Sequence, residues 1–273
     1  MTNKIEKDII KDLDTSKNYV VALSGGVDSA VLATIVAKQV PNLRSIFVRH
    51  NQKYSKDLEE SAYKISKKLK IDHKALDSNL EDNSSETKMR EARYEILYSQ
   101  LKEEEILLMG HTLSDRVETF FINLLRGTRV RGLRSIPKMT ERTKRPLLGV
   151  SKDNLIKYAK ENDIQYLDDV SNFDNTIIRN WIRNELIPKV DEKFLGSIEE
   201  KVSSLIAEIE SIFETTDLEF KYVKTAKGYI EIPVGLIKEK NIKSNMYISL
   251  LSNTLGMPSM QKKDIEKILT AIN

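Results

Sequence analysis

The chain has 273 residues, of which 40% are hydrophobic and 31% are charged, and its 44 basic residues nearly balance its 41 acidic residues. This composition excludes a membrane protein, a disordered chain and a fibrous repeat, and it predicts one large globular domain or one domain with a small companion. The chain has no cysteine, which excludes disulfides, thiolate metal sites, cysteine nucleophiles and cysteine-bound clusters.

The N-terminal half alternates helical patterns with short apolar runs. Residues 1–14 have a helical rhythm and lack the apolar run of a signal peptide, so we expect a cytoplasmic protein. Strands are predicted at 18–23, 43–48, 73–76 and 106–109, and helices at 28–38, 56–69, 86–101 and 113–125, the third of which can be capped by Ser85. Strands separated by helices of this length pair in parallel, so we expect an α/β fold with a doubly wound parallel sheet. Ligands of such sheets bind at the carboxyl ends of the strands.

The C-terminal half is predicted to be mainly helical. Predicted helices run from a Ser151 cap to Asn162, over 178–186 with an end before Pro188, and over 196–214. The remaining pattern predicts a strand pair around 220–223 and 229–232 and helices at 245–255 and 259–272. We therefore place a domain boundary near 190–197, with a large domain over 1–190 and a linker helix with a small domain over 191–273.

A glycine-rich turn follows the first predicted strand. The sequence Ser-Gly-Gly-Val-Asp-Ser covers residues 24–29 and leads into the next helix. In this position, backbone amides and the positive end of a helix can hold a phosphate chain. Asp28 can hold Mg²⁺ on the phosphates or steer a reacting group. The turn lacks the Gly-Lys-Ser/Thr ending of a Walker loop, and the alternative interpretation is a plain turn that needs two glycines.

Further polar residues are predicted at the same edge of the sheet. His111 and His50 each follow a predicted strand. Asp115 and Glu118 are three residues apart at the start of a helix, so their carboxylates share one face and can bracket an ammonium group. The alternatives are structural histidines and a solvated acidic helix start that the helix dipole favours.

The segment 126–145 is basic in a chain of balanced charge. It holds eight lysines and arginines against one acid. Guanidinium groups bind phosphates in a fork, so this segment favours contacts to the phosphates of a nucleic acid. The alternative is a solvated basic loop. Four of its arginines directly follow the predicted helix at 113–125: Arg126, Arg129, Arg131 and Arg134.

Several segments resemble those of known enzyme families. The turn at 24–29 resembles the pyrophosphate loop of the N-type ATP pyrophosphatases, which cleave ATP between the α and β phosphates and leave an adenylated substrate. Similarity to the tRNA-isoleucine lysidine synthetase family extends over residues 17–190 and is carried by REARYEIL (90–97), GHTLSDRVETFFINLLRGTRVRGLRSIP (110–137), RPLLGVSK (145–152) and DDVSNFDNTIIRNWIRNELIP (168–188).

This resemblance implies a reaction. A member of the family uses ATP to ligate lysine to the 2-position of the wobble cytidine of tRNA(Ile) with a CAU anticodon. The reaction passes through an adenylated tRNA and gives lysidine, AMP and pyrophosphate. The implied cofactors are ATP and Mg²⁺, and the implied partners are that tRNA and lysine. The alternatives are another adenylating ligase with the same loop and a catalytically silent tRNA-binding protein.

The resemblance also implies roles for individual residues. Asp28 and His111 are the expected catalytic residues, and Asp28 is the expected metal ligand. ATP binding is expected from Ser24, Gly25, Gly26, Asp28, Ser29, His50 and His111. Lysine binding is expected from Asp115, Glu118 and Arg183, with Arg179 as the alternative to Arg183, and tRNA binding from Arg126, Arg129, Arg131 and Arg134. The family pattern His-His-x-Asp-Asp-Gln reads His-Thr-Leu-Ser-Asp-Arg at 111–116, and Asn184 stands where the family has histidine.

Overall fold

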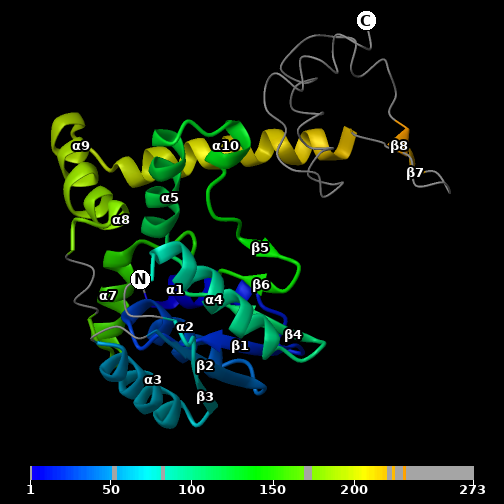
Figure 1. The fold of residues 1–273 in the computed structure, drawn as a ribbon, viewed down its shortest axis with the longest axis vertical. Coiled ribbons are helices and arrows are strands. Elements are labelled where there is room, and N and C mark those ends of the chain that lie inside the picture. Colours follow the sequence, from blue (N-terminus) through cyan, green and yellow to red (C-terminus); the bar gives the residue numbers. More distant parts are fainter. Residues whose placement is uncertain are drawn as a thin grey trace, which may run out of the picture. The chain divides into compact units, whose positions relative to one another are not determined.

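The structure is a computed structural model that describes residues 2–50, 54–80, 84–168, 174–219, 223–224 and 230–231. Contacts within the chain divide it into two units, Met1–Ile209 and Glu210–Asn273, and helix α10 (Ile198–Glu219) crosses this division (Figure 1). The division into 1–190 and 191–273 stays a prediction. The predicted helices at 245–255 and 259–272 lie outside the described residues.

The first unit is built on a six-stranded sheet with the order β3-β2-β1-β4-β6-β5. All neighbouring strands are parallel except β5, which runs antiparallel to β6. This arrangement confirms the predicted doubly wound parallel sheet, with a short antiparallel edge strand added to it. The chain turns back across β1 to place β4 on its other side, so a topological switch point lies between these two strands. The strands are β1 (Asn18–Ala22), β2 (Leu43–Arg49), β3 (Asp72–Asp77), β4 (Glu105–Leu108), β5 (Met139–Thr140) and β6 (Thr143–Lys144).

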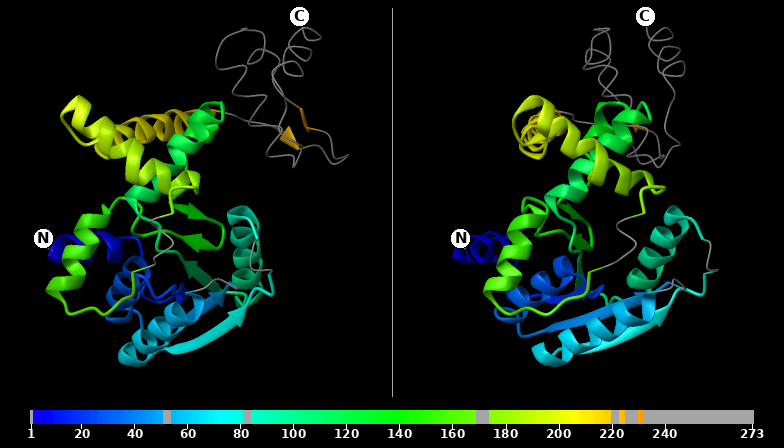
Figure 2. Two further views of the ribbon diagram at one scale, coloured as in Figure 1. Left: turned by 60° about the vertical axis from the view of Figure 1, so that its left-hand side comes forward. Right: turned by 90° about the vertical axis from the view of Figure 1, so that its left-hand side faces the viewer.

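Helices cover both faces of this sheet (Figure 2). Side chains of β1 alternate between the two faces, with Tyr19 and Val21 in one core and Val20 in the other. Helices α1, α2, α3 and α7 pack in the first core, and α4 packs in the second. Their bounds are α1 (Thr2–Lys11), α2 (Val27–Ala37), α3 (Ser55–Leu69), α4 (Glu86–Ser99) and α7 (Lys152–Glu161).

Capping residues fix where several helices begin. The side chain of Ser85 accepts a hydrogen bond at the start of α4, and that of Ser151 does so at the start of α7, as predicted. Helix α5 (Leu113–Leu125) has the predicted bounds and is followed by the short helix α6 (Val130–Leu133). In the second unit, β7 (Val223–Lys224) pairs with β8 (Ile230–Glu231), which confirms the predicted strand pair, and the two strands run antiparallel.

One helix continues past its predicted end. Helix α8 (Ile178–Trp181) runs through a π-helical turn, η2 (Ile182–Leu186), directly into α9 (Ile187–Phe194). The predicted end before Pro188 is therefore wrong. The π-helical turn leads into α9, and Pro188 lies in the first turn of α9, where a backbone N–H is not needed for a helical hydrogen bond. Turns of this kind are frequent at functional sites.

Helix α5 packs in a third cluster of apolar residues, away from the sheet. Val117 and Phe120 of α5 belong to this cluster together with residues of the η2–α9 segment and of the first half of α10. This packing holds the η2 turn against α5, so polar side chains of α8 and η2 can reach the start of α5. Among the described residues, no helix combines the length and the apolar character needed to cross a bilayer.

Candidate active site

The glycine-rich turn joins the buried strand β1 to the N-terminus of α2. Ser29 Oγ accepts a hydrogen bond from the Ser24 backbone N–H at 3.0 Å and donates to the Gly26 carbonyl at 3.1 Å. Helix α2 is apolar on nearly all sides and buried, so the position of the turn is fixed by the core. The turn therefore presents the positive end of a helix at the carboxyl edge of the sheet.

One glycine is required by this geometry, and a second one fits it closely. Gly25 has φ +84°, and a Cβ there would lie 2.3 Å from the Leu58 carbonyl oxygen. A Cβ on Gly110, which follows β4, would lie 3.1 Å from the backbone nitrogen of Ser29. The first glycine lets the turn form, and the second lets the two loops at the switch point approach each other closely.

A cavity of about 230 Å³ opens at the switch point. The glycine-rich turn, helix α4 and the start of α5 contribute to its wall. The predicted residues from the turn and from α5 therefore meet around one space, together with basic residues of α4. Its polar lining includes Ser24, Asp28, Ser29, Arg90, Arg93, His111, Asp115 and Arg179.

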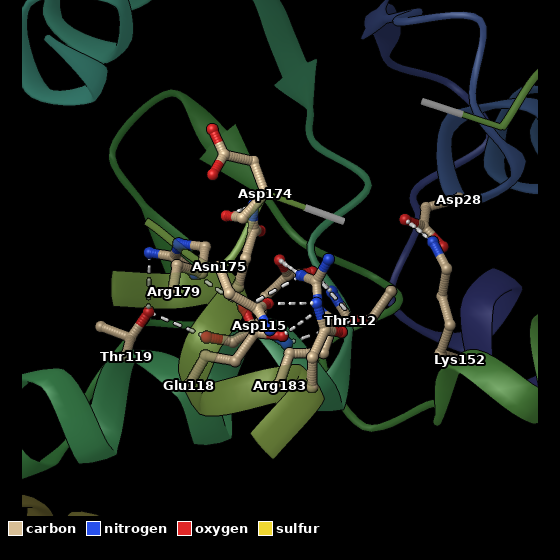
Figure 3. A network of polar contacts seen from close by, with 12 residues as sticks. Asp28, Thr112, Asp115, Glu118, Thr119, Lys152, Asp174, Asn175, Arg179 and Arg183 are labelled. Carbon is tan, nitrogen blue, oxygen red and sulfur yellow. Dashed lines mark hydrogen bonds and ion pairs between the residues drawn. The ribbon is translucent and has the colours of Figure 1, made fainter. Parts of the chain in front are cut away.

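Asp28 lines this cavity and is bound to a lysine. Nζ of Lys152 donates to Oδ2 of Asp28 at 2.6 Å (Figure 3). Oδ1 of Asp28 is buried and has no hydrogen-bond partner among the described residues. Burial raises the pKa of Asp28 above its ordinary value, and the charge of Lys152 opposes this shift without cancelling it.

His111 is held by a buried arginine. Its Nδ1 accepts a hydrogen bond from Nε of Arg145 at 3.2 Å, and Nη2 of Arg145 donates to the Tyr94 hydroxyl at 3.2 Å. Burial is the main cause that lowers the pKa of His111 to about 4; the charge of Asp115 opposes this shift, and nearby arginines contribute to it. A neutral imidazole whose Nδ1 accepts carries its proton on Nε2, so His111 is a donor at neutral pH.

His50 belongs to a neighbouring cavity. That cavity has a volume of about 120 Å³ and shares Ser24 and Arg93 with the first one. Nδ1 of His50 lies 3.1 Å from Oγ of Ser78, and its Nε2 is buried without a partner among the described residues. Burial lowers the pKa of His50 to about 4. The two predicted histidines therefore lie at adjacent spaces, and both are neutral at pH 7.

The side chain of Asp115 is held in place by Thr112, which stands where the family pattern has histidine. Thr112 caps α5, and its backbone N–H and hydroxyl donate to Oδ2 of Asp115 at 2.8 Å and 2.9 Å. Burial acts to raise the pKa of Asp115, but His111 and the two hydrogen bonds from Thr112 outweigh it and lower the pKa. The threonine thus holds this carboxylate ionised and in place at the cavity.

Glu118 is fully buried between two arginines (Figure 3). Arg183 donates from Nε to Oε1 at 2.6 Å and from Nη2 to Oε2 at 3.0 Å. Arg179 donates to Oε2 at 3.2 Å. The two arginines come from opposite sides of the junction between α8 and η2. The structure therefore brings together all three predicted lysine-binding residues, with Glu118 and Arg183 bound to each other and Arg183 4.0 Å from Asp115.

The predicted tRNA-binding arginines lie elsewhere. Arg126 ends α5, and the others lie in or beside α6, none of them at the cavity. Arg126 is eleven residues beyond Asp115, which corresponds to about 16 Å along the helix axis. Arg126 and Arg129 are exposed, and Arg131 and Arg134 are half-buried. This basic surface is therefore separate from the site at the sheet edge.

Several residues at the site were not predicted from the sequence. Lys152 and Arg145 fall in the RPLLGVSK segment, and Arg90 and Arg93 fall in REARYEIL. Both segments resemble the lysidine synthetase family, but no pattern in them indicates which of their cations reaches the cavity.

A metal ion at this site would need ligands from a substrate as well as from the protein. No group of three or more histidine, aspartate or glutamate side chains suited to a metal occurs among the described residues. The buried Oδ1 of Asp28 is an oxygen ligand without a partner in that part of the chain. Mg²⁺ is commonly held by one or two carboxylates together with substrate phosphates, so Asp28 fits such an ion.

Fold and site together define a class of protein: an α/β protein with a phosphate-type turn and a charged cavity at its topological switch point. The PP-loop domain family matches residues 1–190, and the chain belongs to this family.

Two curated relatives of this chain share one name. The chain is 35% identical over 192 residues to a tRNA(Ile)-lysidine synthase from Coxiella burnetii, a match that covers 66% of this chain and 42% of the relative. It is 38% identical over 191 residues to the tRNA(Ile)-lysidine synthase of Buchnera aphidicola subsp. Schizaphis graminum, covering 65% and 42%. The matched region thus spans about half or less of these relatives' length.

Among solved structures, the U34-tRNA thiolase NcsA from Methanococcus maripaludis with its [4Fe-4S] cluster has a similar fold. The TM-score is 0.59 at 19% identity, and the match covers 78% of this chain and 79% of that chain. At this identity the likeness concerns the fold alone.

Proposed function

We propose that this chain catalyses the formation of lysidine at the wobble cytidine of a tRNA(Ile) with a CAU anticodon, using ATP and lysine. The observation that carries the proposal is the meeting of the glycine-rich turn, Asp28, His111 and Asp115 around one cavity at the switch point. The names of the curated relatives support the substrate, and the absence of cysteine argues against the cluster chemistry of the thiolase. We place the activity in the cytoplasm, where tRNA is found.

The turn and Asp28 would handle the polyphosphate of ATP. Ser24 and Ser29 line the cavity, and their hydroxyls and the backbone amides at the start of α2 would suit phosphate oxygens. Asp28 would hold Mg²⁺, which neutralises charge on the phosphates and on the departing pyrophosphate. His111 is neutral and donates from Nε2, so it suits a phosphate oxygen rather than the role of a base.

The chemistry divides into two steps. In the first, the 2-oxygen of cytidine bonds to the α-phosphorus of ATP and pyrophosphate leaves. In the second, the side-chain amine of lysine bonds to C2, AMP leaves with the oxygen, and the amine gives up a proton. The cytidine oxygen leaves only after this activation, because an unmodified carbonyl oxygen is a poor leaving group.

The acidic and basic groups beside the cavity suit the second substrate. Asp115 is held ionised with Oδ2 bound to Thr112, and it faces the cavity. Glu118 and Arg183 form an ion pair that is internal to the protein. Lysine carries a carboxylate and ammonium groups, so an ammonium group can bind the Glu118 carboxylate and the lysine carboxylate can bind the Arg183 guanidinium in exchange for this pair.

The arginines at the end of α5 would position the tRNA through its phosphates. Arg126 lies about 16 Å along the helix from Asp115, and the other three arginines lie in or beside α6, so the nucleic acid would span from this surface to the cavity.

The first step provides the test. Pyrophosphate release from ATP is measured with a tRNA(Ile) transcript that has C34, and with a matched transcript that has G34. We expect release that depends on C34, because only cytidine presents the reacting oxygen. Release that occurs equally without tRNA would favour an adenylating ligase with a small-molecule substrate, and no release with any transcript would favour a silent tRNA-binding protein.

A further inference from the structure

Lys152 lies beside the glycine-rich turn and has no part in the chemistry described above. It is the first residue of α7, next to the Ser151 cap, and its Nζ lies 2.6 Å from Oδ2 of Asp28. Helix α7 packs against α2, which begins at the turn, so the two side chains meet although 124 residues separate them. Figure 3 shows the lysine reaching from α7 toward the carboxylate.

The two oxygens of Asp28 have different surroundings. Oδ2 binds Lys152, whereas Oδ1 is buried without a hydrogen-bond partner among the described residues. An unpaired buried carboxylate oxygen is costly, which points to a ligand that comes from outside the protein. An ammonium group in contact with the same carboxylate repels a second cation, so Lys152 and a metal ion compete for Asp28.

Lys152 is able to leave the carboxylate. Its side chain is 41% exposed, and its four-carbon stem gives the ammonium group several positions around the turn. A polyphosphate bound at the start of α2 would bring anionic oxygens close to this group. The metal that accompanies the polyphosphate would supply the positive charge that Asp28 loses.

We propose that Lys152 is a ligand of the terminal phosphates of the nucleotide and of pyrophosphate, and that it occupies the metal-binding carboxylate, Asp28, while no nucleotide is bound. The inference rests on the proposed function, because it requires a polyphosphate at the turn. It makes Lys152 a positioning residue that moves from Asp28 to the phosphates as the metal arrives.

Two binding measurements on the full chain test this exchange. Pyrophosphate binding with Mg²⁺ is measured by calorimetry, and binding of Mn²⁺ alone is measured by electron paramagnetic resonance. The variants are Lys152→Gln, which removes the charge, and Lys152→Arg, which keeps it. Lys157→Gln, on an exposed lysine of the same helix that pairs with Glu161 at 4.0 Å, is the matched control.

The two measurements should change in opposite directions. For Lys152→Gln we expect pyrophosphate to bind about tenfold more weakly, as for the loss of one charge-assisted contact. We expect Mn²⁺ alone to bind about fivefold more tightly, because nothing competes for Asp28. Lys152→Arg should stay within about threefold of the wild type for both ligands. Lys157→Gln should match the wild type.

Other results would overturn the inference. Unchanged pyrophosphate affinity in a Lys152→Gln chain with wild-type Tm would show that Lys152 is no phosphate ligand. A joint loss of pyrophosphate and Mn²⁺ binding would show that the lysine merely holds Asp28 in place. Failure of the proposed function looks different: a wild-type chain that binds ATP and pyrophosphate but forms no lysidine would contradict the function and leave the role of Lys152 open to the same binding test. A wild-type chain that binds neither ATP nor pyrophosphate would contradict both.

Discussion

Arg183, which lies in the η2 turn, donates a hydrogen bond from its Nε to Oε1 of the fully buried Glu118 at 2.6 Å. Arg179 reaches the same carboxylate from one helical turn earlier. A charge buried this deeply requires such partners, because removing them leaves it uncompensated. The η2 turn and the start of α5 are therefore joined through Glu118, beside the cavity that Asp115 faces.

Glu118→Gln is expected to raise the Michaelis constant for lysine about tenfold or more, because a charge-assisted contact to the ammonium becomes a neutral one. Adenylation of tRNA should continue, since the glycine-rich turn and Asp28 are not altered. Adenylated tRNA should accumulate at low lysine concentrations and can be isolated on acid gels. Loss of ATP consumption with unaltered lysine affinity would assign Glu118 to the nucleotide instead.

Gly25→Ala should lower the free energy of unfolding by at least about 2 kcal/mol, because alanine is strained in the left-handed region. Its Cβ would also lie 2.3 Å from the Leu58 carbonyl. Gly149→Ala is the matched control, since a Cβ there meets nothing within 4 Å. Urea unfolding of both variants measures the difference. Equal stabilities would contradict the close packing of the turn against α3.

Stability should fall as the pH drops from 6.5 toward 4. The pKa values of His50 and His111 are lowered to about 4 from the ordinary 6.5, chiefly by burial. Below pH 6.5 the unfolded chain binds protons that the folded chain does not, which favours unfolding by up to about 1.4 kcal/mol per pH unit for each histidine. His111→Gln should remove one such contribution in urea titrations at several pH values. An unchanged slope in this variant would mean that His111 titrates normally.

Arg129→Ala combined with Arg131→Ala should weaken the binding of different tRNAs to a similar degree. Phosphate contacts do not read sequence, so the loss should also reduce the slope of log affinity against log salt by about 1 to 2. Filter-binding titrations at several salt concentrations measure both quantities. Lys64→Ala with Lys67→Ala, on the exposed face of α3, provides the control. If the two double variants behave alike, α6 does not form a specific tRNA surface.

Much of the fold could be predicted because its signals are local. Buried runs such as 106–109 mark strands, and caps such as Ser85 and Ser151 mark helix starts. The hairpin of β5 and β6 has strands of two residues, which are too short for any periodicity. The π-helical turn depends on packing against α5, which a sequence pattern does not show.

The sequence predicts most residues of the site, but it does not predict which residues form hydrogen bonds with each other. The turn, His111 and Asp115 were predicted to share an edge, and they line one cavity. The partner of Asp28 lies 124 residues away, and that of His111 lies 34 residues away. Such pairs depend on how α7 and β6 pack beside the switch point. From the sequence alone, several lysines and arginines are equally suited to pair with Asp28 or with His111.

Nucleoside mass spectrometry tests the central proposal most directly. A tRNA(Ile) transcript with a CAU anticodon is incubated with ATP, lysine and the wild-type chain, then digested to nucleosides. We predict that one cytidine gains the mass of lysine less water, and that Asp28→Ala reduces this product at least about 100-fold through the loss of phosphate and metal stabilisation. An unmodified cytidine with a wild-type chain that binds both ATP and the tRNA would contradict the proposed function. A wild-type amount of this product from the Asp28→Ala chain would contradict the role of Asp28 in the site.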